Sequence, residues 1–160
     1  MSRRPRVLAV ASTGGHWVQL NRLMPAFDGC ETHWLTTSAD QRAGLASRLA
    51  ERGETPAGFH VCTDANRNEK LRVLRMIAEV AWILLRVRPE VVVTTGAAPG
   101  FVALRLGKLL GARTCWIDSI ANAEELSMSG RLAGPHADLF LTQWPEVARP
   151  EGPHYRGAVL

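Results

Sequence analysis

Residues 7–20 read VLAVASTGGHWVQL, and this stretch decides the fold class. The run from Val7 to Val10 is continuously apolar, as expected for a strand that is buried on both faces of a sheet. Gly14, Gly15 and His16 then stand where the strand must end and a helix must begin. A glycine-rich turn at this place leaves backbone N–H groups free at the helix N-terminus, which suits a phosphate or pyrophosphate. The stretch therefore predicts an α/β protein with an anion-binding loop after its first strand.

The rest of the chain alternates short apolar runs with helical patterns. Apolar strands separated by helices are typical of a parallel sheet that is covered on both faces. We therefore predict a single α/β domain over residues 1–160, with a Rossmann-like, doubly wound parallel sheet. Strands are predicted at 6–12, 32–37, 59–62, 90–96, 113–118, 136–144 and 154–160, and helices at 17–27, 39–53, 66–87 and 99–111.

Composition and charge indicate a soluble globular protein. The chain has 160 residues, of which 46% are hydrophobic and 21% charged, and its net charge of +4 suits anionic partners but is weak evidence for nucleic acid. Cys30, Cys62 and Cys115 have no metal-binding spacing, so we expect reduced core thiols, no metal and no cofactor. The first apolar run is too short for a signal peptide, and there is no stretch of 18 uncharged apolar residues, so we expect a cytoplasmic protein.

A second glycine-rich turn, TTGAAPG, occupies residues 94–100. We call this turn and the one at residues 12–16 the two glycine corners. In a doubly wound sheet, ligands bind beyond the carboxyl ends of the strands where the strand order reverses, and the turns after strands one and four usually flank that point. The spacing fits neither the GxGxxG nor the Walker pattern. The glycines could simply permit tight turns, and His16 could be structural, bind phosphate or act as a general base. The residues expected to line a binding site here are Ser12, Thr13, Gly14, Gly15, Thr95 and Gly96.

The predicted helix at 71–88, LRVLRMIAEVAWILLRVR, has more apolar surface than one sheet face requires. At about 100° per residue its charged side chains, Arg88 excepted, fall within a stripe roughly 60° wide. The surplus around Met76, Trp82 and Ile83 could be buried under other helices, dock a partner, or lie in a membrane interface.

The segment after the predicted strand at 113–118 is rich in hydroxyl and small side chains. It could supply further polar groups to the site, or only the caps and turns for which such residues are common. The residues considered are Asp118, Ser119, Asn122, Ser127, Ser129 and Arg131.

Several short segments of the sequence resemble those of the Alg14 family, which includes bacterial exopolysaccharide proteins of the PssD type. The Gly-Gly-His piece is shared more widely with MurG-like enzymes, whereas the Leu-Ser-Met-Ser-Gly-Arg and Gln-Trp-Pro pieces are more specific. The matching pieces are 12–16 with Gln19 and Leu20, 94–96, 118–120, 126–131, 137–138 and 143–145.

The resemblance implies the N-terminal, acceptor-side half of a GT-B glycosyltransferase. Such a half would bind a lipid-linked sugar acceptor, while a separate Alg13-like or PssE-like subunit would bind a UDP-sugar carrying N-acetylglucosamine or glucuronic acid. Ser12 to Gly15, Thr95, Gly96, Ser119, Asn122, Ser127, Ser129 and Arg131 would bind substrate, and His16 would be the base or a pyrophosphate ligand.

The eukaryotic members begin with a membrane-spanning helix, which is not seen here. We therefore expect peripheral attachment to the inner face of the cytoplasmic membrane through residues 71–88 or through the partner. Two other functions stay open at this point: a non-catalytic membrane recruiter for a catalytic partner, and a stand-alone nucleotide-sugar-binding protein.

Overall fold

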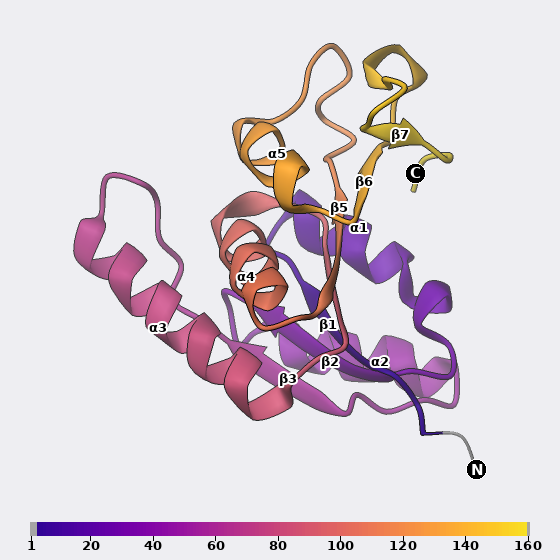
Figure 1. The fold of residues 1–160 in the computed structure, drawn as a ribbon. Coiled ribbons are helices and arrows are strands. Elements are labelled where there is room, and N and C mark those ends of the chain that lie inside the picture. Colours follow the sequence, from indigo (N-terminus) through magenta and orange to yellow (C-terminus); the bar gives the residue numbers. More distant parts are fainter. Residues whose placement is uncertain (1–2, 160) are drawn as a thin grey trace.

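A computed structural model describes residues 3–159 of the chain. Its seven strands form one parallel sheet (Figure 1). The strands are β1 (Arg6–Val10), β2 (Glu31–Thr36), β3 (Gly58–Val61), β4 (Val91–Thr94), β5 (Arg113–Ile117), β6 (Leu139–Thr142) and β7 (His154–Tyr155). The α-helices are α1 (Gly15–Arg22), α2 (Gln41–Glu51), α3 (Lys70–Val87), α4 (Ala97–Leu109) and α5 (Met128–Ala133), with 3₁₀ turns at Met24–Phe27, Gly134–His136 and Pro145–Val147.

The strand order is β3-β2-β1-β4-β5-β6-β7, so the chain moves outward in one direction from β1 and in the other from β4. The order therefore reverses between β1 and β4, which pair directly with Val7 opposite Val91 and Val10 opposite Thr94. This is the crevice at which doubly wound sheets bind ligands. The predicted fold class is confirmed, and so is the expectation that the two glycine corners follow neighbouring strands.

Helices cover both faces of the sheet because alternate residues of each central strand point to opposite sides. On one face, Leu8 and Val10 of β1 share a buried cluster with side chains of α3 and α4. On the other face, Val7 and Ala9 pack in a cluster with Trp17 of α1 and Leu45 of α2. The sheet is thus the middle of three layers, and its carboxyl edge is where the loops gather.

Several element boundaries differ from the sequence prediction by a few residues, among them the last strand, which ends at Tyr155, and two of the helix boundaries differ for clear local reasons. The helix predicted at 17–27 ends at Arg22. Pro25 lies in the 3₁₀ turn that follows, and because proline has no backbone N–H it could not donate the hydrogen bond that a continued α-helix requires. The helix predicted to begin at 66 begins at Lys70, because the Asn66 side chain accepts the backbone N–H of Asn68 in a turn that competes with helix formation. Helix α5 was not predicted.

The surplus apolar surface of α3 is divided between the core and the exterior. Met76 and Ile83 are buried, whereas Leu71, Leu74, Trp82 and Leu85 are exposed. We call these four residues the outer stripe of α3. Within residues 3–159, no helix has both the length and the apolar character needed to cross a bilayer.

Candidate functional site

The two glycine corners lie against each other at the carboxyl edge of the sheet and are joined by two hydrogen bonds. The Thr95 hydroxyl donates to the backbone carbonyl of His16 at 2.7 Å. In the other direction, Nδ1 of His16 lies 2.8 Å from the backbone carbonyl of Thr95. The loop after β1 and the loop after β4 are therefore held as one unit, with a half-buried histidine between them.

The hydrogen bond from His16 to the Thr95 carbonyl decides which nitrogen of the imidazole carries the proton. A carbonyl oxygen can only accept, so Nδ1 must be the donor and Nε2 of the neutral ring keeps a free lone pair. A histidine whose Nδ1–H is oriented by an acceptor and whose Nε2 is free has the arrangement of a general base.

Gly96 makes this approach possible. Its φ of +126° lies in the region that L side chains rarely adopt, and a Cβ built there would lie only 2.8 Å from Cε1 of His16. Ala97, the first residue of α4, also has a positive φ, of 67°. Strained backbone of this kind costs on the order of 1–3 kcal/mol per residue and is concentrated at functional sites. Ala97 carries this strain, whereas Gly96 adopts its positive φ without it and lets His16 come close.

Both helices that start at these corners have uncapped N-termini. Helix α1 follows Gly14 and α4 follows Gly96, and neither end has a side-chain cap or an acidic residue in its first turn. The first-turn N–H groups of α1, and those of Ala97 and Ala98 in α4, thus lack side-chain caps beside the β1–β4 crevice, whereas Pro99 of α4 has no N–H to offer. Both helix ends carry partial positive charge. This arrangement suits a ligand with two adjacent anionic groups.

Ser12 and Thr13 lie in the loop between β1 and α1, where both are half-buried. The backbone N–H of Thr13 donates to the Thr37 hydroxyl at 3.3 Å, which ties this loop to the one after β2. Gly15 is exposed at the start of α1.

A buried amide network connects this corner to the ends of β5 and β6. The Gln19 side chain donates to the Ser119 hydroxyl at 3.2 Å and accepts from the side-chain amide of Gln143 at 2.6 Å. Gln143 also donates to the backbone carbonyl of Asp118. Ser119 is therefore fixed next to α1. The sequence analysis missed the roles of Gln19 and Gln143, and their only signal was that both fall within the family-like pieces.

Asp118, at the end of β5, organises the loop that follows it. Its carboxylate accepts hydrogen bonds from the Trp116 indole, the Asn122 amide, and both the hydroxyl and the backbone N–H of Ser127. Ser127 in turn caps α5 by accepting the N–H of Gly130 at 2.9 Å. Ser127 is therefore a helix cap, one of the two roles that the sequence allowed for it. The loop at 119–127 is held in shape by the buried carboxylate of Asp118.

Replacing Asp118 by asparagine is expected to lower the free energy of unfolding by about 2–4 kcal/mol. The NH₂ group of asparagine cannot accept a hydrogen bond, so it would face buried donors whose hydrogen bonds the carboxylate now accepts. For a chain of this size the melting temperature should fall by roughly 5–15 °C. Thermal unfolding followed by circular dichroism measures this. Asp64→Asn, at an exposed position, is the matched control. Equal melting temperatures for the two variants would contradict this role of Asp118.

Ser129 and Arg131 lie on α5, away from the hydrogen bonds that join the glycine corners. Arg131 is exposed, donates to the backbone carbonyl of Leu126 and forms an ion pair with Glu125. Close to this helix, the Arg67 guanidinium contacts the sulfur of Met128 at 3.5 Å. The loop before α3 and the start of α5 therefore meet at the edge of the site.

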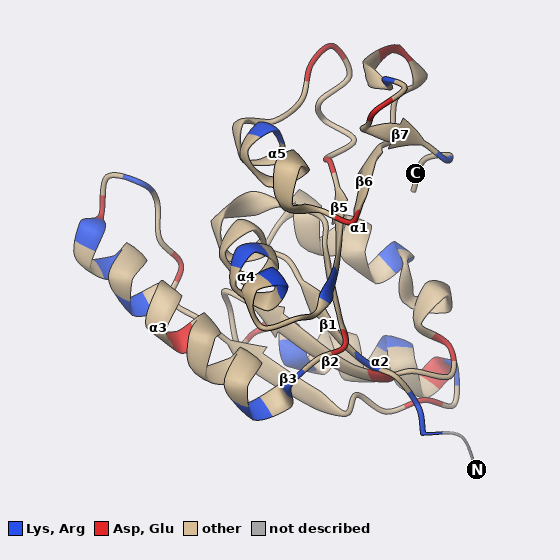
Figure 2. Cartoon of the chain, viewed as in Figure 1, with Lys and Arg blue, Asp and Glu red and all other residues tan. Residues whose placement is uncertain are grey.

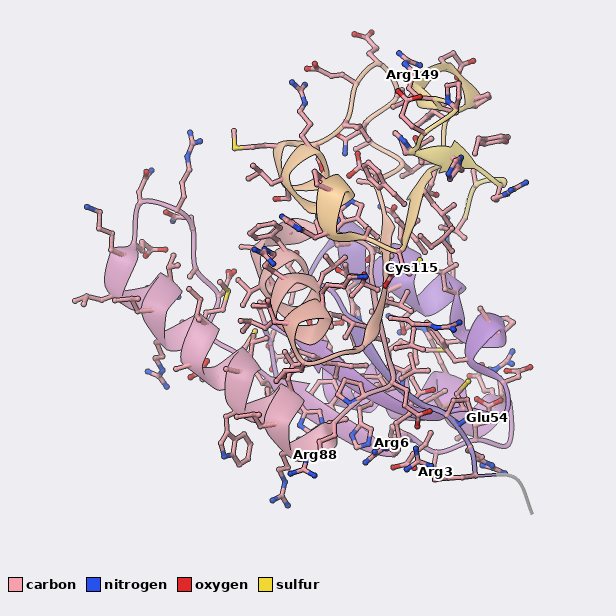
Figure 3. All side chains as sticks on the ribbon, viewed as in Figure 1. Arg3, Arg6, Glu54, Arg88, Cys115 and Arg149 are labelled. Carbon is pink, nitrogen blue, oxygen red and sulfur yellow. The ribbon has the colours of Figure 1, made fainter. Side chains whose placement is uncertain are left out.

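Burial affects two of the three free cysteines, Cys62 and Cys115. Burial raises the pKa of Cys62 and of Cys115 to about 12, so both thiols stay protonated at neutral pH. Among residues 3–159, no three His, Cys, Asp or Glu side chains form a group that could hold a metal ion. In Figure 3, the partly buried Cys115 lies between Arg149 near one end of the view and Arg3, Arg6 and Arg88 near the other.

Comparison with known families gives one clear match. A family model described as "Oligosaccharide biosynthesis protein Alg14 like" matches residues 63–159. The UDP-N-acetylglucosamine transferase subunit ALG14 of Eremothecium gossypii is 29% identical over 170 residues, which cover 89% of this chain and 74% of that protein. The human subunit of the same name is 24% identical over 164 residues, covering 88% and 76%.

Solved structures share the fold. The MurG structure from Acinetobacter baumannii superposes with a TM-score of 0.70 at 14% identity, covering 96% of this chain and 45% of that protein. The UDP-GlcNAc 2-epimerase of Neisseria meningitidis, bound to UDP-GlcNAc, gives a TM-score of 0.60 at 14% identity, covering 86% and 40%. The chain thus spans less than half the length of these proteins and has the architecture of one GT-B half.

Proposed function

Because the chain belongs to the Alg14-like family of oligosaccharide biosynthesis proteins, we propose that it is the acceptor-side subunit of a two-component inverting glycosyltransferase. The complex would transfer a sugar, N-acetylglucosamine or glucuronic acid, from a UDP-sugar to an acceptor linked to a polyprenyl pyrophosphate. This chain would bind the acceptor, and an Alg13-like or PssE-like subunit would bind the donor. The relatives' description as transferase subunits supports a divided enzyme.

The observation that carries this proposal is the pair of glycine corners with His16 between them. Two uncapped helix N-termini at one crevice offer backbone donors for a pyrophosphate, with one phosphate group at each glycine corner. The free Nε2 of His16 lies beside them, where the sugar attached to that pyrophosphate would sit. A candidate anion-binding site and a candidate base thus lie side by side.

The proposed reaction needs one base on this side. A hydroxyl oxygen of the acceptor sugar attacks the anomeric carbon of the donor, the bond from that carbon to UDP breaks, and Nε2 of His16 takes the hydroxyl proton. The carbonyl of Thr95 stabilises the imidazolium that forms, because it accepts the hydrogen bond from Nδ1. Stabilisation of the leaving UDP falls to the donor subunit.

Ligand binding by the isolated chain tests the division of labour. We expect the chain to bind a short-chain polyprenyl pyrophosphate sugar and to show no saturable binding of UDP-N-acetylglucosamine or UDP-glucuronic acid in calorimetry. Tight binding of a UDP-sugar without the acceptor analogue would overturn the proposal and favour a stand-alone nucleotide-sugar-binding protein.

The outer stripe of α3 supports a peripheral contact with the membrane that holds the acceptor. Leu74 and Trp82 are 62% and 61% exposed, although both are large apolar side chains. Figure 2 shows basic residues along the first half of α3 and near its end, with one acidic residue near its middle. Arg86 stacks on Trp82 and Arg88 follows the helix, so cations flank the stripe where anionic headgroups would lie.

The double variant Leu74→Glu/Trp82→Glu is therefore expected to bind vesicles containing phosphatidylglycerol at least about tenfold more weakly, because it loses apolar burial and adds two negative charges. Vesicle flotation measures this. The control is Leu139→Glu/Tyr155→Glu, which makes the same kind of change at exposed positions on β6 and β7, strands near the opposite edge of the sheet. Equal binding by the two double variants would exclude α3 as the membrane contact.

A non-catalytic recruiter is the second candidate function, and the exposed stripe is the observation that favours it. In that case the partner would carry out the whole reaction, and this chain would only bring it to the lipid. Variants of Gly14, His16 and Ser129 would then change the location or assembly of the complex more than its turnover.

A further inference from the structure

Thr94, the last residue of β4, carries a buried hydroxyl group at the start of the second glycine corner. It lies in the middle of the sheet, between Val10 of β1 and Trp116 of β5. Burying a hydroxyl is costly unless the group is hydrogen-bonded. Val92 points to the same face of β4 and is apolar, so the polar group at Thr94 needs a reason of its own.

The partner of this hydroxyl is a peptide group that also contacts His16. The backbone N–H of Gly96 donates to Oγ1 of Thr94 at 3.1 Å. This N–H and the carbonyl of Thr95 belong to one planar peptide unit, because the peptide bond joins residue 95 to residue 96. The same carbonyl accepts the hydrogen bond from Nδ1 of His16 at 2.8 Å. Thr94 and His16 therefore hold one peptide plane from its two ends.

The shared plane couples the hydroxyl to the imidazole. A planar unit cannot turn its N–H without turning its carbonyl, so the bond to Thr94 fixes the direction in which the carbonyl of Thr95 points. This restraint matters because the plane ends at Gly96, and glycine has the most conformational freedom of any residue. Hydrogen bonds in a chain also polarise one another, so the bond to Oγ1 makes the carbonyl a stronger acceptor for Nδ1 of His16.

Gly100 of α4 makes room for this arrangement. A Cβ built at Gly100 would collide with Oγ1 of Thr94 and lie 3.1 Å from the Cβ of that residue. Gly100 thus leaves space for the hydroxyl in the same way that Gly96 leaves space for the imidazole. Both glycines of this corner are explained by one chain of contacts that ends at His16.

We infer that Thr94 is a positioning residue for His16: its hydroxyl fixes the peptide plane between Thr95 and Gly96, and that plane keeps the imidazole proton on Nδ1. Loss of the hydroxyl lets the carbonyl turn away and lets the proton move to Nε2, the nitrogen that must stay free to act as a base. The effect on the ring does not depend on the proposed function, whereas an effect on sugar transfer rests on it.

The chain offers a matched control for the turn itself. A threonine hydroxyl that accepts the N–H two residues further on is a common turn. The same turn occurs at the end of β6, where Oγ1 of the buried Thr142 accepts the N–H of Trp144 at 3.2 Å. Thr142→Val removes this bond far from His16, since β5 lies between β4 and β6.

The ¹⁵N signals of the imidazole in the labelled full chain test the inference, because they show which nitrogen of the neutral ring carries the proton. Loss of these signals in His16→Ala assigns them. We expect Nδ1–H in the wild type, in Thr94→Ser, which keeps the hydroxyl, and in Thr142→Val. Thr94→Val removes the hydroxyl and should give a mixture of both tautomers. Thr94→Ala also lacks the hydroxyl and should behave in the same way.

In the assembled transferase, Thr94→Val is expected to lower kcat about tenfold with little change in the acceptor KM, because a misoriented base is competent only part of the time. Thr94→Ser should restore most of the rate, and Thr142→Val should keep it.

Three results would overturn the inference: wild-type imidazole signals in Thr94→Val and Thr94→Ala, an equal change in Thr94→Ser, or an equal change in Thr142→Val. A changed imidazole with an unchanged kcat would overturn its catalytic part. The signals of the imidazole require neither a donor subunit nor sugar transfer. A wild-type complex that transfers no sugar would therefore refute the proposed function alone, and the tautomers of the variants would still decide the role of Thr94.

Discussion

Replacing His16 by alanine in the assembled transferase is expected to lower kcat by about 100- to 10,000-fold, the usual contribution of a positioned general base. The reason is geometric. Thr95 fixes the proton on Nδ1, so Nε2 is the atom that can accept the proton of the attacking hydroxyl. Alanine leaves the backbone of α1 unchanged but removes this acceptor. Steady-state rates with saturating acceptor and donor measure the loss.

The result separates three roles of His16. A large fall in kcat with little change in the acceptor KM is expected for a base. A normal kcat with a raised acceptor KM would contradict this and leave His16 as a ligand of the pyrophosphate. Normal kinetics with a complex that no longer reaches the membrane would favour the recruiter. His154→Ala, at a half-buried histidine on β7, controls for a general effect of losing an imidazole.

Gly96→Ala is the second change with a large expected effect, and it acts on His16 without altering it. The new Cβ would lie 2.8 Å from Cε1 and 2.9 Å from Nδ1 of the imidazole, so the ring must move and its hydrogen bond to Thr95 must break. A misplaced catalytic group can lower the rate about 100-fold, and we expect a loss of this order in kcat. The strained backbone should also reduce the free energy of unfolding by about 1–3 kcal/mol.

Gly111→Ala provides a matched control for the backbone effect. Gly111 also has a positive φ, of 89°, but a Cβ at that position would meet nothing within 4 Å. Both variants should lose stability, and only Gly96→Ala should lose turnover. If the two retained equal kcat values, the position of His16 would not matter for the reaction, and its assignment as the base would be wrong.

The sheet could be predicted because its signals are local. The central strands β1 and β4 are short, mostly apolar runs, and the two glycine corners mark where they end. In a doubly wound sheet, the loops after the two strands at which the strand order reverses lie next to each other. The close approach of Gly96 to His16 follows from this rule.

The rest of the site depends on contacts between distant residues. Asp118 shapes the loop before α5 through bonds to Asn122 and Ser127, and a loop built around one buried carboxylate has no periodic pattern to reveal it. The link between Gln19 and Gln143 spans most of the chain, and either glutamine alone looks like an ordinary polar residue.

The exposure of α3 illustrates a different limit. The sequence shows that the helix has more apolar surface than the sheet can bury, but only the structure separates Met76 in the core from Trp82 outside. Helical periodicity gives the relative angles of side chains, and the packing of α4 against α3 decides which of those angles face the interior.

The most direct test of the central claim is a transfer assay on the chain purified from its own cells in mild detergent, together with any companion that remains bound at one to one. We predict a small donor-binding companion, and transfer from a UDP-sugar to a polyprenyl-pyrophosphate-linked acceptor only when both proteins are present. A chain that is monomeric without a companion, or one that transfers the sugar alone, would contradict the proposal of a divided transferase.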